Sequence, residues 1–271
     1  MPDTRKKRVE THHADTIRNV VRKFEADPSV RGLLLGGSIA HGFAKPDADV
    51  DIAIVVSAEE FARRRAENRL TFFDRSLCTY PEGYVDGKFM DEDFLREVAR
   101  RGSEPARYAF KDARILFSRI DGLERLLAGI VRYPVEVKTD RIARFAAQLV
   151  GWRWFFSEGE KKDSDYLKTL AVQKVVLFSC RIVLAETELL FPFHKWMLRV
   201  TLAAPRLPIG FGGSIDRILA SPSFALIDAH CRETLAFAGL DHDAVNATWG
   251  ANFMRDTELR WMTDSASIDD C

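Results

Sequence analysis

A buried strand that runs directly into two glycines is the feature that most constrains the fold of this chain. The apolar run Leu33–Leu35 predicts the strand. Gly36 and Gly37 follow, and glycine at a strand end lets the backbone approach a ligand closely or adopt a positive φ. Ser38 stands where a helix would begin, and its hydroxyl and the free N–H groups of a first helical turn make an anion site. The pattern predicts a phosphate-binding turn.

Two aspartates follow about ten residues later, at the start of a second apolar run. Asp49 and Asp51 are two apart in a strand-like segment that continues to Val56, so their side chains share one face. Like charges repel there unless water screens them or a divalent cation lies between them. Mg²⁺ prefers one or two carboxylates together with substrate phosphates. The spacing therefore favours metal-assisted phosphoryl or nucleotidyl transfer over the alternative, a surface turn that enters an ordinary strand.

The segment from Gly36 to Val56 resembles the signature of the nucleotidyltransferase superfamily related to DNA polymerase β, whose small members include antibiotic nucleotidyltransferases that modify aminoglycosides and lincosamides. The resemblance implies an α/β fold, a mixed sheet with flanking helices. It also implies that Ser38 and nearby backbone N–H groups hold the triphosphate of an NTP such as ATP. Asp49 and Asp51 would then bind Mg²⁺, expected as two ions.

The same family supplies a third carboxylate from a later strand. Asp86 is the first candidate, because the run from Gly83 to Met90 alternates as a strand. Asp91 is the alternative, although it opens an acidic segment typical of a helix start. Whether Asp86 is a metal ligand or the general base stays open. Lys88 shares the face of Asp86 and could reach a phosphate.

The organisation of the chain changes at Tyr133-Pro134. Before it, the pattern predicts helices and strands, including a helix over 13–26, a strand near 76–80 and a helix over 91–101. Beyond it, apolar residues at three- and four-residue spacing over 137–156 and 164–190 predict long helices. We therefore expect a nucleotidyltransferase domain over residues 1–132 and an α-helical bundle over 133–271 that binds substrate or nucleotide.

Two further residues beside these motifs have competing interpretations. The segment from Phe191 to Trp196 resembles a Pro-x-x-Lys-Trp segment in the helical domains of some bacterial antibiotic-type nucleotidyltransferases. Lys195 would reach a nucleotide phosphate, or both Lys195 and Trp196 would only begin a helix. His41, beside the glycines, could touch a phosphate, but we expect an exposed histidine.

Composition narrows the partners. The chain has 271 residues with 40 basic and 40 acidic side chains, a net charge of zero. This balance argues against a long nucleic acid, whose binding proteins carry a basic excess, and favours a small acceptor. The four scattered cysteines and a polar, basic segment from Met1 to His13 predict a cytoplasmic protein without a signal peptide. No membrane span is expected, and a monomer and a homodimer both fit.

The leading functional hypothesis is transfer of a nucleoside monophosphate from an NTP to a hydroxyl group of a small molecule, with release of pyrophosphate. Two alternatives remain. One is a protein-modifying, AMP-adding enzyme of the toxin–antitoxin type. The other is a non-catalytic nucleotide-binding module, which would be expected to lose the acids that this chain keeps.

Overall fold

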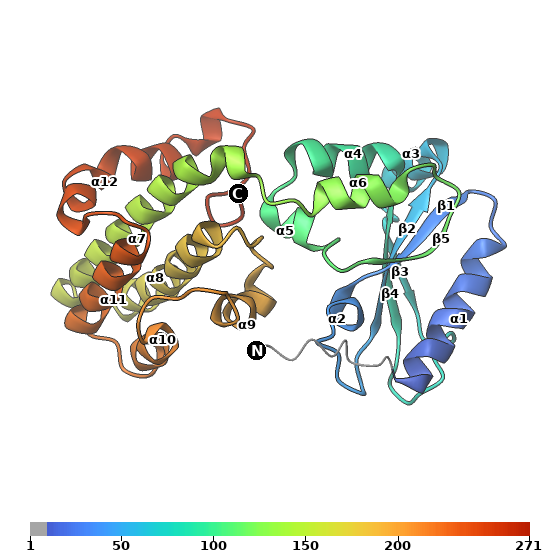
Figure 1. The fold of residues 1–271 in the computed structure, drawn as a ribbon, viewed down its shortest axis with the longest axis horizontal. Helices are drawn as coiled ribbons and strands as arrows, with labels where there is room; N and C mark the ends of the chain where they lie inside the picture. Colours follow the sequence, from blue (N-terminus) through green and yellow to red (C-terminus); the bar gives the residue numbers. More distant parts are fainter. Residues whose placement is uncertain (1–9) are drawn as a thin grey trace. The chain divides into compact units, whose positions relative to one another are not determined.

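A mixed five-stranded sheet forms the centre of the first half of the chain (Figure 1). The computed structural model describes residues 10–271. Residues 1–9, most of the segment from which we predicted the absence of a signal peptide, lie outside the described residues. The strands are β1 Val30–Leu35, β2 Val50–Val56, β3 Thr71–Asp74, β4 Val85–Met90 and β5 Arg114–Ser118, in the spatial order β3-β4-β2-β1-β5. Among the strands of residues 10–271, β2 and β4 alone pair in parallel. The predicted fold class is confirmed.

Alternation along the strands gives the sheet two buried faces. On one face, Leu33 and Ile52 pack with Val20 of α1 (Thr11–Glu25). On the other, Leu34 and Val55 pack under α4 (Glu92–Arg101) and α6 (Leu123–Ile130). The remaining helices of this half are α2 (Gly37–Ala40), α3 (Ala58–Ala66) and α5 (Glu104–Tyr108). Asp51 points to the α4–α6 side because it alternates with Ile52.

The strand predicted near residues 76–80 is wrong. The edge strand is β3, and a turn follows it directly. The carboxylate of Asp74 accepts hydrogen bonds from the backbone N–H of Ser76 at 2.8 Å and from its hydroxyl at 2.6 Å. An aspartate that bonds the backbone two residues ahead stabilises a turn in competition with a strand.

The second half of the chain is helical, as predicted. Its helices are α7 (Lys138–Lys161), α8 (Asp165–Glu186), α9 (Met197–Leu202), α10 (Phe211–Ala220), α11 (Phe224–Phe237) and α12 (His242–Thr257). Every residue of α8 from Val175 to Ala185 is buried, so this helix is the centre of the bundle. Among the described residues, no helix combines the length and apolar character needed to cross a bilayer.

The chain divides into two compact units. The first contains the residues up to Gly102 and Ala106–Arg132, and the second contains Ser103–Pro105 and Tyr133–Cys271. Glu104 explains the three-residue excursion. Its buried carboxylate pairs with Arg181 at 3.1 Å and with Arg141 at 3.0 Å, within the second unit. Sequence reasoning did not anticipate this segment, because nothing local marks a glutamate that will pair with an arginine 77 residues away.

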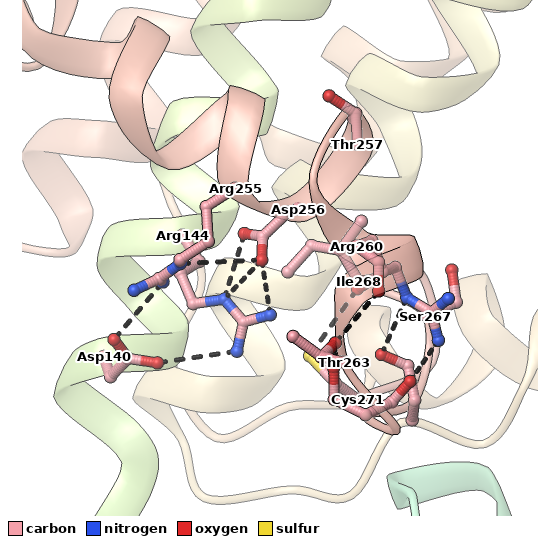
Figure 2. A network of polar contacts seen from close by, with 12 residues as sticks. Asp140, Arg144, Arg255, Asp256, Thr257, Arg260, Thr263, Ser267, Ile268 and Cys271 are labelled. Carbon is pink, nitrogen blue, oxygen red and sulfur yellow. Dashed lines mark hydrogen bonds and ion pairs between the residues drawn. The ribbon is translucent and has the colours of Figure 1, made fainter.

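The last residues of the chain pack onto the helical unit (Figure 2). Arg144 of α7 binds the buried carboxylate of Asp256 through its Nε at 3.0 Å and its Nη2 at 2.6 Å. In the segment after α12, the carbonyl oxygen of Asp269 accepts a hydrogen bond from Arg181 of α8 at 2.6 Å, and Ile268 is buried. Charge-assisted bonds to buried groups therefore fix the chain after α12.

We expect the stability of the helical unit to fall in acid because of His230. This side chain is 3% exposed, its Nδ1 lies 2.9 Å from the hydroxyl of Ser214, and burial lowers its pKa to about 4. In the unfolded chain the His230 imidazole has a pKa near 6.5, so between pH ~6.5 and 4 it is protonated there but neutral in the folded protein. Stability is therefore complete above pH ~6.5 and is lost as the pH falls towards 4, by roughly 3 kcal/mol at ~1.4 kcal/mol per pH unit.

The measurement is the free energy of unfolding in urea between pH 7 and pH 4. His230→Gln should remove this part of the slope, whereas His194→Gln, at an exposed site, should keep it. Equal slopes in the wild type and His230→Gln would contradict the prediction.

Candidate active site

Strand register places two of the predicted acids side by side. Asp51 is the second residue of β2 and Asp86 the second residue of β4, and the parallel ladder pairs these two residues directly. Neighbouring strands are about 4.8 Å apart, so the two carboxylates begin on adjacent positions of one face. Asp49 lies just before β2. The N-terminal ends of the two parallel strands therefore gather three carboxylates on the α4–α6 side of the sheet.

The glycines pack against this acidic row. The N–H of Gly36 donates to the carbonyl oxygen of Asp51 at 2.9 Å and joins the end of β1 to the start of β2. Gly37 has a φ of +60°, and a Cβ atom placed on it would lie 1.7 Å from Oδ2 of Asp51. Any other residue would displace that carboxylate or strain the backbone. The glycine-rich turn and the acid are thus parts of one site.

Ser38 carries an unused hydroxyl beside them. It lies in α2, the single helical turn that follows Gly36. Its Oγ is buried and finds no hydrogen-bond partner within residues 10–271. A buried hydroxyl without a partner costs about 1–3 kcal/mol. A ligand oxygen or a water molecule that accepts its proton would recover that cost, as the predicted phosphate contact requires.

Tyr84 reports the combined charge of the acids. The carboxylate of Asp49, as a hydrogen-bonding partner and then as a charge, raises the pKa of the phenol, and burial and the charges of Asp51 and Asp86 raise it further. One side chain therefore feels all three acids. Within residues 10–271, however, no three His, Cys, Asp or Glu side chains converge closely enough to hold a metal ion by themselves.

The structure separates the two candidates for the third acid. Asp91 follows β4 at its far end, five residues and about 16 Å along the strand from Asp86. Its carboxylate accepts the N–H of Phe94 at 2.7 Å and caps α4. Asp86 is therefore the acid beside Asp51, and its catalytic role stays a prediction. Lys88, exposed and two residues beyond, shares the face of Asp86.

Gly87, the glycine that follows Asp86, has a packing reason. A Cβ atom on Gly87 would meet Cγ1 of Ile52 at 2.9 Å and Cδ1 of Ile54 at 3.3 Å. Branched side chains of the neighbouring strand fill the space on that face. The glycine therefore serves the packing of the core, and the opposite, acidic face is unaffected.

Three side chains that sequence reasoning left unused hold the loop that enters β2. We call His12, His13 and Tyr80 the loop clamp. The Nε2 of His12 lies 2.8 Å from the carbonyl oxygen of Pro46, and the Nε2 of His13 lies 3.0 Å from that of Ala48. The hydroxyl of Tyr80 donates to the same Ala48 oxygen at 2.5 Å. Because a carbonyl oxygen only accepts, Nε2 carries the proton in both rings.

The clamp fixes the backbone on one side of Asp49. On the other side, the N–H of Val50 donates to the carbonyl oxygen of Tyr84 at 3.1 Å. The rings of the clamp also pack together, with His12 and His13 centroids 4.2 Å apart and His12 and Tyr80 centroids 4.6 Å apart. Burial chiefly lowers the pKa of His13. A signal for the clamp lay in the adjacent histidines at the start of a helix, but the partners are 34 and 35 residues away.

His41 and Lys195, the two other residues considered for phosphate contact, lie in different surroundings from each other. The His41 side chain is only 4% exposed, so the expectation of an exposed histidine is wrong; its Nδ1 lies 3.2 Å from Asp112, and its ring packs on Phe43 and Tyr108. Lys195 is exposed in the helical unit, with its Nζ 5.3 Å from the Trp196 ring, in a short 3₁₀ turn before α9. Its contact with a phosphate stays a prediction.

The part of the chain that carries the glycines and the acids matches a known protein family. Residues 15–89 match the family model described as a nucleotidyltransferase domain. The matched segment runs from α1 to β4 and contains the glycines, Ser38 and all three acids. A solved structure, a nucleotidyltransferase-like protein from Exiguobacterium sibiricum 255-15, is 15% identical over 93% of this chain and 80% of its own, with a TM-score of 0.45. No curated protein matches the chain. The family match supports the predicted nucleotidyltransferase superfamily.

We expect Tyr80→Phe to loosen the loop that carries Asp49. The substitution removes the bond to the Ala48 carbonyl oxygen while the ring can stay packed on the histidines. The free energy of unfolding should fall by about 1 kcal/mol, and hydrogen exchange at the amides of residues 46–50 should become faster. Tyr166→Phe, at a side chain that is 78% exposed, is the matched control and should change neither quantity. Unchanged exchange in Tyr80→Phe would show that the clamp does not hold the loop.

Proposed function

We propose that the protein is a Mg²⁺-dependent nucleotidyltransferase that moves a nucleoside monophosphate from an NTP to a hydroxyl group of a small molecule and releases pyrophosphate. Residues 1–132 would perform the transfer, and the helical residues 133–271 would help to hold the substrates. The observation that carries the proposal is the direct contact between the glycine turn and the paired acids, in which Gly37 leaves room only for the carboxylate of Asp51.

The residues present fit a nucleotide with its metal. The acids offer hard oxygen ligands, and Mg²⁺ in nucleotide sites takes only one or two carboxylates, with phosphate oxygens and waters for the rest. Asp49 and Asp51 would hold the metal, which neutralises charge on the phosphates.

Each residue then has a defined task. Ser38 and the N–H groups of the turn would bind the β- and γ-phosphates, and the exposed Lys88 would offset their charge. Asp86 would accept the proton of the attacking hydroxyl or complete the metal site. In the reaction, a bond forms between the acceptor oxygen and the α-phosphorus, the bond from that phosphorus to the bridging oxygen breaks, and pyrophosphate leaves. Positioning and electrostatic stabilisation supply most of the catalysis in such transfers.

A small acceptor fits the chain better than a polymer. The equal numbers of acidic and basic residues provide no overall basic excess for a nucleic acid. Hydroxyl-bearing antibiotics belong to the acceptors worth testing, by analogy with the resembling family, and fold alone does not fix the substrate. A protein acceptor would reveal itself as a labelled protein band after incubation of the enzyme with labelled ATP and cell lysate.

We expect Asp49→Asn and Asp51→Asn to abolish pyrophosphate release, measured in a screen of the four NTPs against hydroxyl-bearing metabolites and antibiotics. The loss should be about 100-fold or more. Stability should not fall, because each change relieves repulsion between neighbouring carboxylates. Asp86→Asn should also inactivate the enzyme. Asp91→Asn is the matched control and should retain activity, because asparagine is an equally good helix cap. Wild-type turnover in Asp51→Asn would refute the proposal.

A further inference from the structure

We propose that Phe73, Tyr84 and Arg75 form the binding site for the acceptor, and that the acceptor is a hydroxyl-bearing molecule with a flat ring face. We call these three residues the aromatic platform. The inference rests on the proposed function, because it names where the second substrate of the same reaction binds. Neither the family match nor the sequence motifs assign a role to these residues.

Phe73 lies on the acidic face and is left open to solvent. The antiparallel ladder pairs it directly with Asp86, so both side chains point to the same side of the sheet. The phenyl group of Phe73 is 60% exposed, whereas its neighbour Phe72 packs into the core on the opposite face. Core packing accounts for Phe72 but not for Phe73. An exposed aromatic ring beside a row of carboxylates gains free energy when a flat apolar surface covers it.

The platform is held in place before any ligand binds. The rings of Phe73 and Tyr84 stack with centroids 5.2 Å apart and an interplanar angle of 30°. The guanidinium carbon of Arg75 lies 5.7 Å from the first centroid and 5.9 Å from the second, within the range of cation–π attraction. Tyr84 also lies close enough to the acids for Asp49, Asp51 and Asp86 to raise the pKa of its phenol. A ring stacked here would therefore have a defined position relative to the acids.

The order of the groups across the sheet determines which substrate the platform receives. Along one cross-strand row, Phe73 is followed by Asp86, then Asp51, and then the glycine turn. Leaving and attacking oxygens lie on opposite sides of the phosphorus in an in-line displacement. With the leaving pyrophosphate bound at the glycines and Ser38, the attacking hydroxyl comes from the Asp86 side. The platform lies on that side, which assigns it to the acceptor rather than to the phosphates.

The test measures binding without requiring turnover. Phenyl β-D-glucopyranoside, which carries a flat ring and hydroxyl groups, is the probe, added to the full chain with Mg²⁺ and a non-hydrolysable ATP analogue. Saturation-transfer NMR should detect binding of the phenyl ring to the wild type. Phe73→Ala should lower the affinity for the probe about tenfold, and Phe73→Trp should restore that affinity. Phe94→Ala, at another exposed phenylalanine of the same unit, is the matched control and should change nothing.

Further variants separate the failure of this inference from failure of the proposed function. Asp51→Asn should no longer release pyrophosphate but should bind the probe with unchanged affinity. Phe73→Ala should bind the ATP analogue with unchanged affinity. If Phe73→Ala instead weakens the ATP analogue and leaves the probe unchanged, the platform holds the nucleobase and the acceptor assignment is wrong. Absence of probe binding to the wild type at millimolar concentration, or equal binding by the wild type and Phe73→Ala, also overturns it.

Discussion

The parallel pairing of β2 with β4 is the constraint on which the rest of the site depends. It brings the carboxylates of Asp51 and Asp86 to neighbouring positions on one face, where they repel. The groups around the two carboxylates would suit a bound cation and its phosphates. The glycine turn leaves room for one carboxylate, the hydroxyl of Ser38 is buried without a partner in the described residues, and the acids raise the pKa of the neighbouring Tyr84. A divalent cation bound with phosphates would resolve the repulsion that the fold maintains.

The two faces of the sheet divide structure from chemistry. The side chains that alternate towards α1 build an apolar layer, which includes the space that Gly87 leaves for Ile52, and at its edge Asp74 pairs with Lys23 of α1. The other face is apolar only under α4 and α6, and its strand starts are polar. Strands hold Asp51 and Asp86, and the loop clamp, two histidines of α1 with Tyr80, holds the loop before β2. Placing reactive groups on regular elements supported by a second layer of contacts keeps their geometry fixed.

The helical unit has its own core and its own charged interior. Arg181 lies between the rings of Phe145 and Phe191 and pairs with Glu104, a residue from the segment that precedes the last strand of the sheet. A buried pair of this kind is costly to form and more costly to break. Glu104 therefore belongs to the second unit by its contacts, although the residues on either side of Ser103–Pro105 belong to the first.

The sequence alone indicated most elements and the kind of site to expect. Apolar periodicity predicted strands in the first half and long helices in the second, the resemblance implied the mixed sheet with flanking helices, and the spacing from Gly36 to Asp51 predicted the kind of site, because these signals are local. Tertiary structure decided which distant residues meet. Register placed Asp86, not Asp91, beside Asp51, turned Phe73 to the acidic face, and brought His12 and His13 to a loop more than thirty residues away. Pairing between strands and contacts between distant segments depend on how whole elements pack, and no short run of residues encodes that.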